Sequence, residues 1–329
     1  MNDSTASSRA VLPGFDDVLA AAARIAPHAH VTPVLRSQGL DAIAGCELHF
    51  KAEHLQRAGA FKFRGACNAI WSLDDADAAR GVVTHSSGNH GAALALAART
   101  RGIACHVVVP EGAVAAKLAA IEAYGAVLHR CAPTIAAREA RCAQVQAETG
   151  AELVHPYTDA RVIAGQGTAA LELLGSTAEP FGAMVVPVGG GGLAAGTALT
   201  LAARSPSTTF YLAEPAGAAE TFESLRRGER VTQFTPDTLC DGLRGTLGEP
   251  NFELLRAHGV QVLTVDDAAT VAAMRLLWQR AKQVVEPSSA IALAAVLAHR
   301  ERFAGRRVGI VLSGGNVDPD ALPELFARG

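Results

Sequence analysis

Short, nearly continuous hydrophobic runs alternate along the chain with alanine-rich segments of helical length. The runs rich in β-branched residues predict strands over 81–85, 104–109, 126–130, 183–188, 209–213 and 307–312. The segments between them predict helices over 92–101, 115–124, 135–149, 193–203 and 271–282. Because the strands of a parallel sheet are buried on both faces, this alternation predicts an α/β fold built on parallel sheets.

One uncharged stretch, residues 181–203, is long enough to span a bilayer. Pro187 and a run of four glycines at residues 189–192 interrupt it. We therefore expect a buried strand, a glycine turn and a buried helix, and no membrane partner.

Composition narrows the class of protein. The 329 residues are 49% hydrophobic with a net charge of −3, so we expect one large or two medium domains and no nucleic-acid partner. The six cysteines include no CxxC pair, which favours reduced thiols over disulfides or a zinc site. The first eight residues lack the order of a secretion signal, so we expect a short disordered tail and a cytoplasmic location.

Polar or glycine-rich turns follow several predicted strands, at residues 86–91, 189–192, 214–215 and 313–316. Ligands of parallel sheets bind at the carboxyl ends of the strands, so these turns predict one shared site. The glycine turn at 189–192 precedes a predicted helix and is typical of a phosphate site. Gly190, Gly192 and Ala195 also satisfy the G-x-G-x-x-A pattern, with Glu214 ending the next strand, so a dinucleotide-binding protein is the alternative.

Lys62 lies between Phe61 and Phe63, with Arg64 two residues further on. Burial and a neighbouring positive charge both lower a lysine's pKa and leave the amine nucleophilic, as Schiff-base chemistry requires. A surface lysine is the alternative for this position taken alone.

Five ordered motifs carry a resemblance to a known family, at residues 59–66, 84–91, 162–168, 186–193 and 311–318. From about residue 15 to 318 the chain resembles the fold-type II pyridoxal-phosphate enzymes of the serine/threonine dehydratase and serine racemase group. The resemblance implies a two-domain, tryptophan synthase β-like fold and a homodimer. A large domain of residues 1–80 and 158–329 would hold the cofactor, and a smaller α/β domain of residues 81–157 would be inserted into it.

The same resemblance assigns roles around pyridoxal 5'-phosphate. Lys62 would carry the cofactor aldehyde as a Schiff base, Phe61 would pack beside the ring and Asn89 would bind the phenolic oxygen. Ser313 would face the pyridine nitrogen. The phosphate would be held by Gly189, Gly190, Gly191, Gly192 and Leu193.

Substrate contacts are assigned in the same way. The substrate carboxylate would be bound by Ser86, Ser87, Gly88, Asn89 and His90. Ser87 matches the second acid/base of serine racemases or is only a carboxylate-binding hydroxyl, and the His90 ring either binds substrate or braces the loop. Arg138 matches a racemase position implicated in substrate binding.

The resemblance implies a β-hydroxy-α-amino-acid dehydratase. It would convert L-serine or L-threonine type substrates, through an aminoacrylate, to a 2-keto acid and ammonia. Tyr157 fits dehydratases, and the small Ala92 and Gly245 leave room for a bulky substrate such as phenylserine. A serine racemase with side dehydratase activity is the alternative.

A divalent-metal site is also implied. Glu214, the carbonyl of Ala218 and Glu220 align with the metal ligands of the racemase-like branch, and their oxygens suit Mg²⁺ or Ca²⁺. Two solvated acids at a strand end are the alternative.

Overall fold

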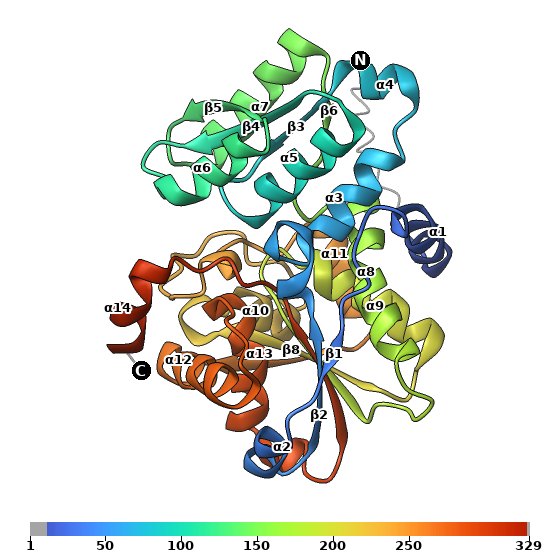
Figure 1. Ribbon diagram of the computed structural model, residues 1–329, viewed down its shortest axis with the longest axis vertical. Helices are drawn as coiled ribbons and strands as arrows, with labels where there is room; N and C mark the ends of the chain where they lie inside the picture. Colours follow the sequence, from blue (N-terminus) through green and yellow to red (C-terminus); the bar gives the residue numbers. More distant parts are fainter. Residues whose placement is uncertain (1–11, 328–329) are drawn as a thin grey trace.

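The computed structural model describes residues 12–327, so the tail expected for the first eight residues lies outside it. Two sheets organise these residues (Figure 1). The larger has six strands in the order β1-β2-β10-β7-β8-β9, and only the β1–β2 pair is antiparallel. Its strands are β1 (Val34–Leu35), β2 (Glu47–Ala52), β7 (Ala183–Pro187), β8 (Thr209–Pro215), β9 (Gln261–Val265) and β10 (Arg307–Leu312).

The smaller sheet has four strands, all parallel, in the order β5-β4-β3-β6. They are β3 (Val82–His85), β4 (Cys105–Pro110), β5 (Val127–Cys131) and β6 (Glu152–Leu153). Helices α5 (Asn89–Arg101) and α6 (Ala115–Ala123) pack on one face and α7 (Ile135–Thr149) on the other.

Helices cover both faces of the larger sheet. Along β7, Val185 joins the core beneath α13, and the next residue, Val186, joins the core beneath α9. The helices grouped with this sheet are α1 (Phe15–Ile25), α2 (Gln38–Ala44), α8 (Ala160–Gly175), α9 (Gly192–Arg204), α10 (Glu220–Arg227), α11 (Glu249–Ala257), α12 (Asp267–Leu276), α13 (Pro287–Ala298) and α14 (Leu322–Ala327). Burial on both faces explains why these strands are continuously hydrophobic.

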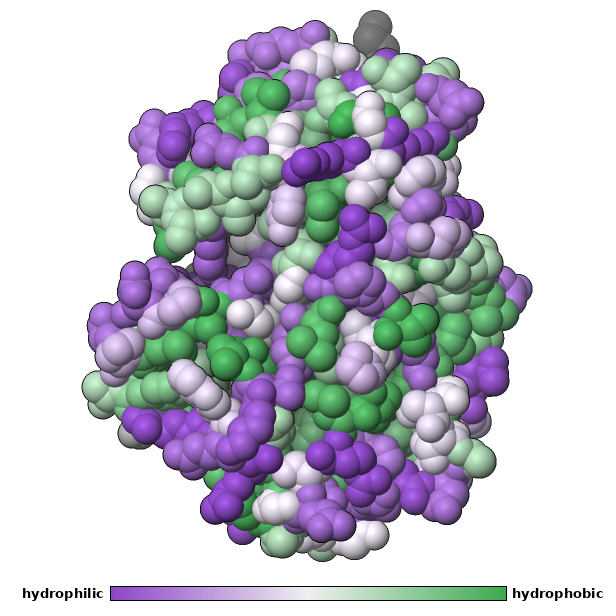
Figure 2. All heavy atoms as spheres, in the orientation of Figure 1, coloured by the Kyte–Doolittle hydropathy of each residue, from purple (hydrophilic) through white to green (hydrophobic). Residues whose placement is uncertain are grey.

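Helix α3 (Lys62–Trp71) lies between the two halves, and α4 (Asp75–Arg80) follows it. Phe63 and Ile70 of α3 share one hydrophobic cluster with Val82 and Val107 of the smaller sheet. The same helix also packs along α8. The molecular surface is notched on the left where the two halves meet (Figure 2). The domain boundary at residue 81 stays a prediction.

The α/β fold with parallel sheets is confirmed. The uncharged stretch forms β7, the glycine turn and α9, as expected. All six cysteines are free thiols. Between residues 12 and 327 no helix combines the length and the apolar character that crossing a membrane requires.

Candidate active site

A cavity of about 1470 Å³ opens between the two sheets, at the carboxyl ends of β3, β7 and β10. Every residue predicted to bind cofactor or substrate lines it: Phe61, Lys62, Ser86, Ser87, Gly88, Asn89, His90, Arg138, Gly189, Gly190, Gly191, Gly192, Leu193 and Ser313. The turn after β8 does not, so Glu214, Ala218 and Glu220 lie apart from the other predicted residues.

Lys62 is the first residue of α3, and its amine faces this cavity. Nζ donates to the carbonyl of Pro156 at 2.9 Å and lies 5.2 Å from the centre of the Phe61 ring. Burial lowers the pKa of Lys62 to about 8, and the negative charge of Glu286 acts in the opposite direction. Lys62 is therefore a weakly basic amine inside a cavity, not a surface lysine.

The expectation that the positive charge of Arg64 lowers the pKa of Lys62 was wrong. Its guanidinium pairs with Glu53 and Glu172 in the protein interior, so its charge is neutralised there. The lowered pKa of Lys62 therefore comes from burial.

The glycine turn presents free donors to the cavity. Within residues 12–327, the backbone N–H groups of Gly190, Gly191, Gly192 and Leu193 have no hydrogen-bond acceptor. They stand at the N-terminus of α9, where the helix dipole favours an anion. These donors fit a phosphate group.

Packing against Tyr157 also requires glycine in this turn. A Cβ atom on Gly190 would lie 2.4 Å from the Tyr157 ring, and Gly191 has a φ of +90°. Asn251 ties the two segments together by donating to the carbonyls of Tyr157 at 2.9 Å and Gly190 at 2.5 Å. No residue pattern indicated this second cause of the glycine run in advance.

Ser313 follows β10 and is buried beside Lys62. Its carbonyl accepts from the backbone N–H of Phe61 at 2.9 Å, and among residues 12–327 its hydroxyl makes only a long contact, 3.5 Å, with the carbonyl of Ser288. A weakly held neutral hydroxyl is suited to a pyridine nitrogen that stays unprotonated.

Glu286 was missed by sequence reasoning. It caps the N-terminus of α13, is buried, and lines the cavity. Asn89 donates to its carboxylate at 2.8 Å and accepts from Asn316 at 2.9 Å, so the Asn89 amide is held in one orientation. Burial and the neighbouring Asp241 raise the pKa of Glu286 to about 8. Its only local signal is the proline that follows it at the helix start.

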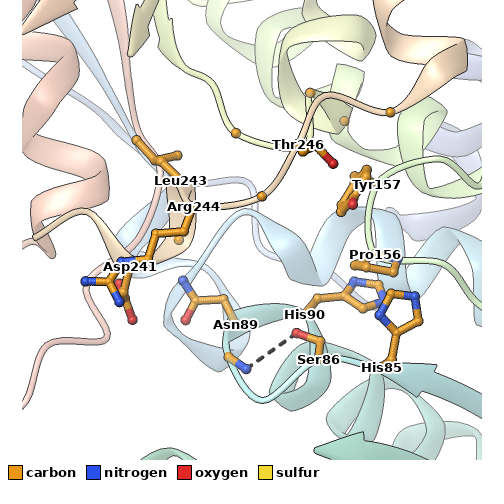
Figure 3. Close-up of a pocket in the computed structure, with 18 of the residues that line it drawn as sticks. His85, Ser86, Asn89, His90, Pro156, Tyr157, Asp241, Leu243, Arg244 and Thr246 are labelled. Atoms are coloured by element: carbon orange, nitrogen blue, oxygen red, sulfur yellow. Dashed lines mark hydrogen bonds between the residues drawn. The ribbon is translucent and has the colours of Figure 1, made fainter. Parts of the chain in front are cut away.

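The turn at residues 86–91 joins β3 to α5. Figure 3 shows Ser86, Asn89 and His90 grouped on one side of the cavity, with the Gly88 N–H donating to the Ser86 hydroxyl. Within the described chain the Ser87 hydroxyl has no partner. The His90 ring is buried and contacts the Val154 carbonyl at 3.3 Å, as expected of a residue that braces the loop.

Arg138 enters the cavity from α7. Its Nε atom is buried and has no hydrogen-bond partner among the described residues. Three rings line the cavity nearby, with His155 edge-on to both His85 and Tyr157. Burial lowers the pKa of His155 to about 3, so Arg138 is the permanent positive charge in this group.

Tyr157 and Gly245 line the cavity, but Ala92 does not. Ala92 is buried in the core between α5 and the smaller sheet. Of the two small residues noted in the sequence, only Gly245 bears on the size of the site.

Glu214 and Glu220 are not solvated acids, since they are only 1% and 3% exposed. Both Glu214 oxygens accept backbone N–H groups, from Thr221 at 2.7 Å and Phe222 at 2.9 Å, and Glu220 accepts from Leu247 at 2.7 Å. Burial raises their pKa values to about 8 and about 7. Two buried carboxyls suit a hard cation by charge, although Arg230 already acts on Glu220 and the backbone donors already use the oxygens.

The same contacts remove the dinucleotide alternative. The Glu214 carboxylate faces the N-terminus of α10 and does not line the cavity, so it is not placed to bind a ribose beside the glycine turn.

Comparisons with known proteins agree with this geometry. The model of the family described as "Pyridoxal-phosphate dependent enzyme" matches residues 25–314. A beta-hydroxyaspartate dehydratase from Paracoccus denitrificans is 46% identical over 95% of this chain and 99% of its own length. A serine racemase from Dictyostelium discoideum is 44% identical over 94% of this chain and 97% of its own. The solved structure of maize serine racemase superposes with a TM-score of 0.92 at 43% identity, covering 97% of this chain and 98% of that one.

Proposed function

This chain belongs to the pyridoxal-phosphate dependent enzymes, and from that premise we propose that it is a dehydratase of β-hydroxy-α-amino acids. It removes the β-hydroxyl as water and releases a 2-keto acid and ammonia. The observation that carries the proposal is that the Lys62 amine, the free N–H groups of the glycine turn and the Ser313 hydroxyl line one cavity.

Bound pyridoxal phosphate withdraws electrons from the substrate's Cα and so makes the Cα–H acidic. Lys62 would hold the cofactor through its amine, and the same Nζ would take the Cα proton of the substrate. Its pKa of about 8 leaves part of the amine neutral near pH 7, as a general base requires.

The remaining groups bind and orient. The turn at residues 86–91 holds the substrate carboxylate at the N-terminus of α5. Asn89, fixed between Glu286 and Asn316, orients the cofactor ring, and the glycine turn holds the phosphate. Ser313 would face the ring nitrogen as a neutral hydroxyl that does not donate its proton, which would favour loss of the β-hydroxyl as the outlet for charge at Cα.

Arg138 suggests the substrate side chain. A guanidinium with a buried, unpartnered Nε binds a carboxylate well, which favours substrates with an acidic β-substituent such as β-hydroxyaspartate. A relative named as a beta-hydroxyaspartate dehydratase supports this substrate. L-Serine and L-threonine remain candidates, and so does phenylserine, because Gly245 leaves space in the cavity.

Racemisation is a second candidate activity. The Ser87 hydroxyl lines the cavity and has no hydrogen-bond partner among residues 12–327, which supports a role as a second acid/base, and a serine racemase is among the relatives. Ser87→Ala separates the two reactions, since it should abolish formation of D-serine and leave elimination of the L-substrate within about threefold.

The test is a keto-acid release assay over hydroxyaspartate, serine, threonine and phenylserine. Hydroxyaspartate should give the highest kcat/KM, and Arg138→Met should raise its KM at least about tenfold while changing that of serine less than twofold. Lys62→Ala should be inactive and should lack the cofactor's visible absorbance. A wild-type protein that stays colourless with added cofactor contradicts the proposal, and abundant D-serine with little pyruvate favours the racemase.

We also propose a homodimer and a cytoplasmic location. Sedimentation velocity of the purified holoenzyme tests the first, because a single species at the monomer mass contradicts it. Fractionation of the cells that make the protein tests the second.

A further inference from the structure

Behind Lys62 lies a buried cluster of charged side chains, which we call the Arg64 cluster: Arg64, Glu53, Glu172 and Lys51. Arg64 and Glu53 are fully buried, Lys51 is 1% exposed, and the Glu172 side chain is 24% exposed. The two positive and two negative charges cancel, so the cluster places no net charge behind the cofactor site.

Arg64 makes four hydrogen bonds to the two carboxylates of this cluster. Nε and Nη2 donate to the two Glu53 oxygens at 2.7 and 2.8 Å, and Nη1 and Nη2 donate to the two Glu172 oxygens, each at 2.7 Å. Nη1 also reaches Thr168 at 3.2 Å. A planar guanidinium held by two carboxylate forks is fixed in position and in rotation.

The two carboxylates come from different parts of the larger half. Glu53 follows β2 directly, and Glu172 stands near the end of α8. Lys51 of β2 donates to Glu172 at 2.5 Å and to the Thr32 carbonyl at 2.6 Å, which holds Glu172 from its other side. The Arg64 cluster therefore anchors the first turn of α3 to both β2 and α8.

Lys62 and Arg64 leave opposite sides of this turn. Residues two apart on an α-helix are separated by about 200° around its axis. Fixing Arg64 in rotation therefore fixes the direction in which Lys62 leaves the helix. The Arg64 cluster and the cavity lie on opposite sides of the first turn of α3, and no residue of the Arg64 cluster lines the cavity.

We propose that Arg64 is a positioning residue for Lys62: its two carboxylate forks set the direction in which α3 delivers the lysine amine to the cofactor. The proposal rests on the role of Lys62 in the proposed function and is independent of which amino acid is the substrate.

Arg64→Lys and Arg64→Met test this on the reconstituted holoenzyme. Lysine keeps the charge and loses the forks, whereas methionine loses both. If position matters, both variants should lose the bound cofactor about tenfold faster on dialysis, because a misdirected Lys62 amine holds the cofactor less well. The visible circular dichroism per bound cofactor should also fall, because it reports the cofactor's orientation and not the stability of the fold.

Arg161→Lys is the matched control. Arg161 also pairs with two carboxylates, Asp159 and Glu152, but does not line the cavity or contact the Arg64 cluster. Its cofactor release and dichroism should stay within twofold of wild type. The proposal is overturned if Arg64→Lys stays within that range too, or if Arg161→Lys changes both measurements as much as Arg64→Lys does.

Glu172→Gln decides the question if the Arg64 variants do not fold, since it leaves the Glu53 fork in place. About threefold faster release with reduced dichroism supports the proposal, and wild-type behaviour overturns it. Lys62→Ala separates this from the proposed function. If the wild-type protein takes up no cofactor at Lys62, the proposed function fails. If the wild-type protein does take up cofactor and the variants of the Arg64 cluster behave like wild type, only this inference fails.

Discussion

Two side chains of opposite charge titrate in the same range inside the cavity. The pKa of Lys62 is lowered to about 8 and that of Glu286 is raised to about 8, in both cases mainly by burial. Near pH 7 most of the Glu286 carboxyl is therefore protonated. The carboxyl accepts the hydrogen bond of Asn89 in either form, and its ionised fraction raises the pKa of Lys62 against the effect of burial.

Glu286→Gln should change the pH dependence of stability. Between the ordinary pKa of 4.5 and the raised value of about 8, the folded protein keeps a proton that the unfolded chain has lost, so stability falls as the pH rises. Glutamine cannot ionise and removes this fall. The apo variant should melt about 3 °C above wild type at pH 8 and close to wild type at pH 5. Equal differences at both pH values, measured by calorimetry, would contradict this assignment.

The sequence predicted the residues of the cavity better than the contacts between them. Lys62, Ser313 and the glycine turn lie in short motifs whose chemistry is local, and all of them line the cavity. Glu286 and the partners of Arg64 come from distant parts of the chain. A buried glutamate looks like a surface residue in sequence, because only the folded chain supplies Asn89 as its partner.

The turn between β7 and α9 is tightly packed against Tyr157. Gly190→Ala adds a methyl group where the Tyr157 ring lies, and should destabilise the apo protein by about 1–3 kcal/mol. Gly245→Ala is the control, because its nearest neighbour would be 4.0 Å away. In urea unfolding, Gly190→Ala combined with Tyr157→Ala should cost less than the sum of the single changes. Strict additivity would show that the clash is not with Tyr157.

The junction of β8 and α10 tests the proposed metal site. If Glu214 and Glu220 hold a divalent cation, 1 mM Mg²⁺ or Ca²⁺ should raise the melting temperature by a few degrees, as binding at about 100 times the Kd adds about 2.7 kcal/mol. Glu220→Gln should remove the shift, whereas Glu223→Gln, an acid of the same helix that pairs with Arg226 and Arg227, should retain it. A shift that survives in Glu220→Gln places the ion elsewhere.

At the scale of elements, the prediction found most of the longer strands, including the mixed β5, and missed the mixed strands β2 and β9. Strand β2 carries His49 and Lys51, both buried, and β9 begins with the exposed Gln261. Lys51 is tolerated in a buried strand because Glu172 neutralises it across the fold. Hydrophobic periodicity does not detect a buried charge that is neutralised by a distant partner. It therefore located β7, β8 and β10 but not β2.

Across the whole molecule, an ion pair joins the two halves at the cavity. Lys117 of α6 contacts the carboxylate of Asp241, in the loop before α11, and both residues line the cavity. The side chains are partly exposed, so the pair contributes only about 0.2–1 kcal/mol to stability. Its position suggests an effect on how readily the halves separate.

Lys117→Met should therefore speed substrate exchange more than it lowers stability. We expect the holoenzyme to release a competitive dicarboxylate inhibitor about two- to threefold faster in stopped flow, with a melting temperature within about 2 °C of wild type. Arg256→Met, which breaks a surface pair with Glu253 inside α11, should change neither measurement. If Lys117→Met releases the inhibitor at the wild-type rate, the ion pair between Lys117 and Asp241 does not influence access to the cavity.

The place of β10 in the larger sheet has a consequence for biosynthesis. This strand lies between β2 and β7, and Arg307 pairs with Glu47 across 260 residues of chain. During translation, strand β2 cannot pair with β10 because β10 has not yet been synthesised. The hydrophobic edge of the β1–β2 pair therefore stays exposed until residue 312 has left the exit tunnel. Contacts so distant in sequence form slowly, and exposed edges invite aggregation in the meantime. A nascent chain stalled before this strand would be a strong client for chaperones.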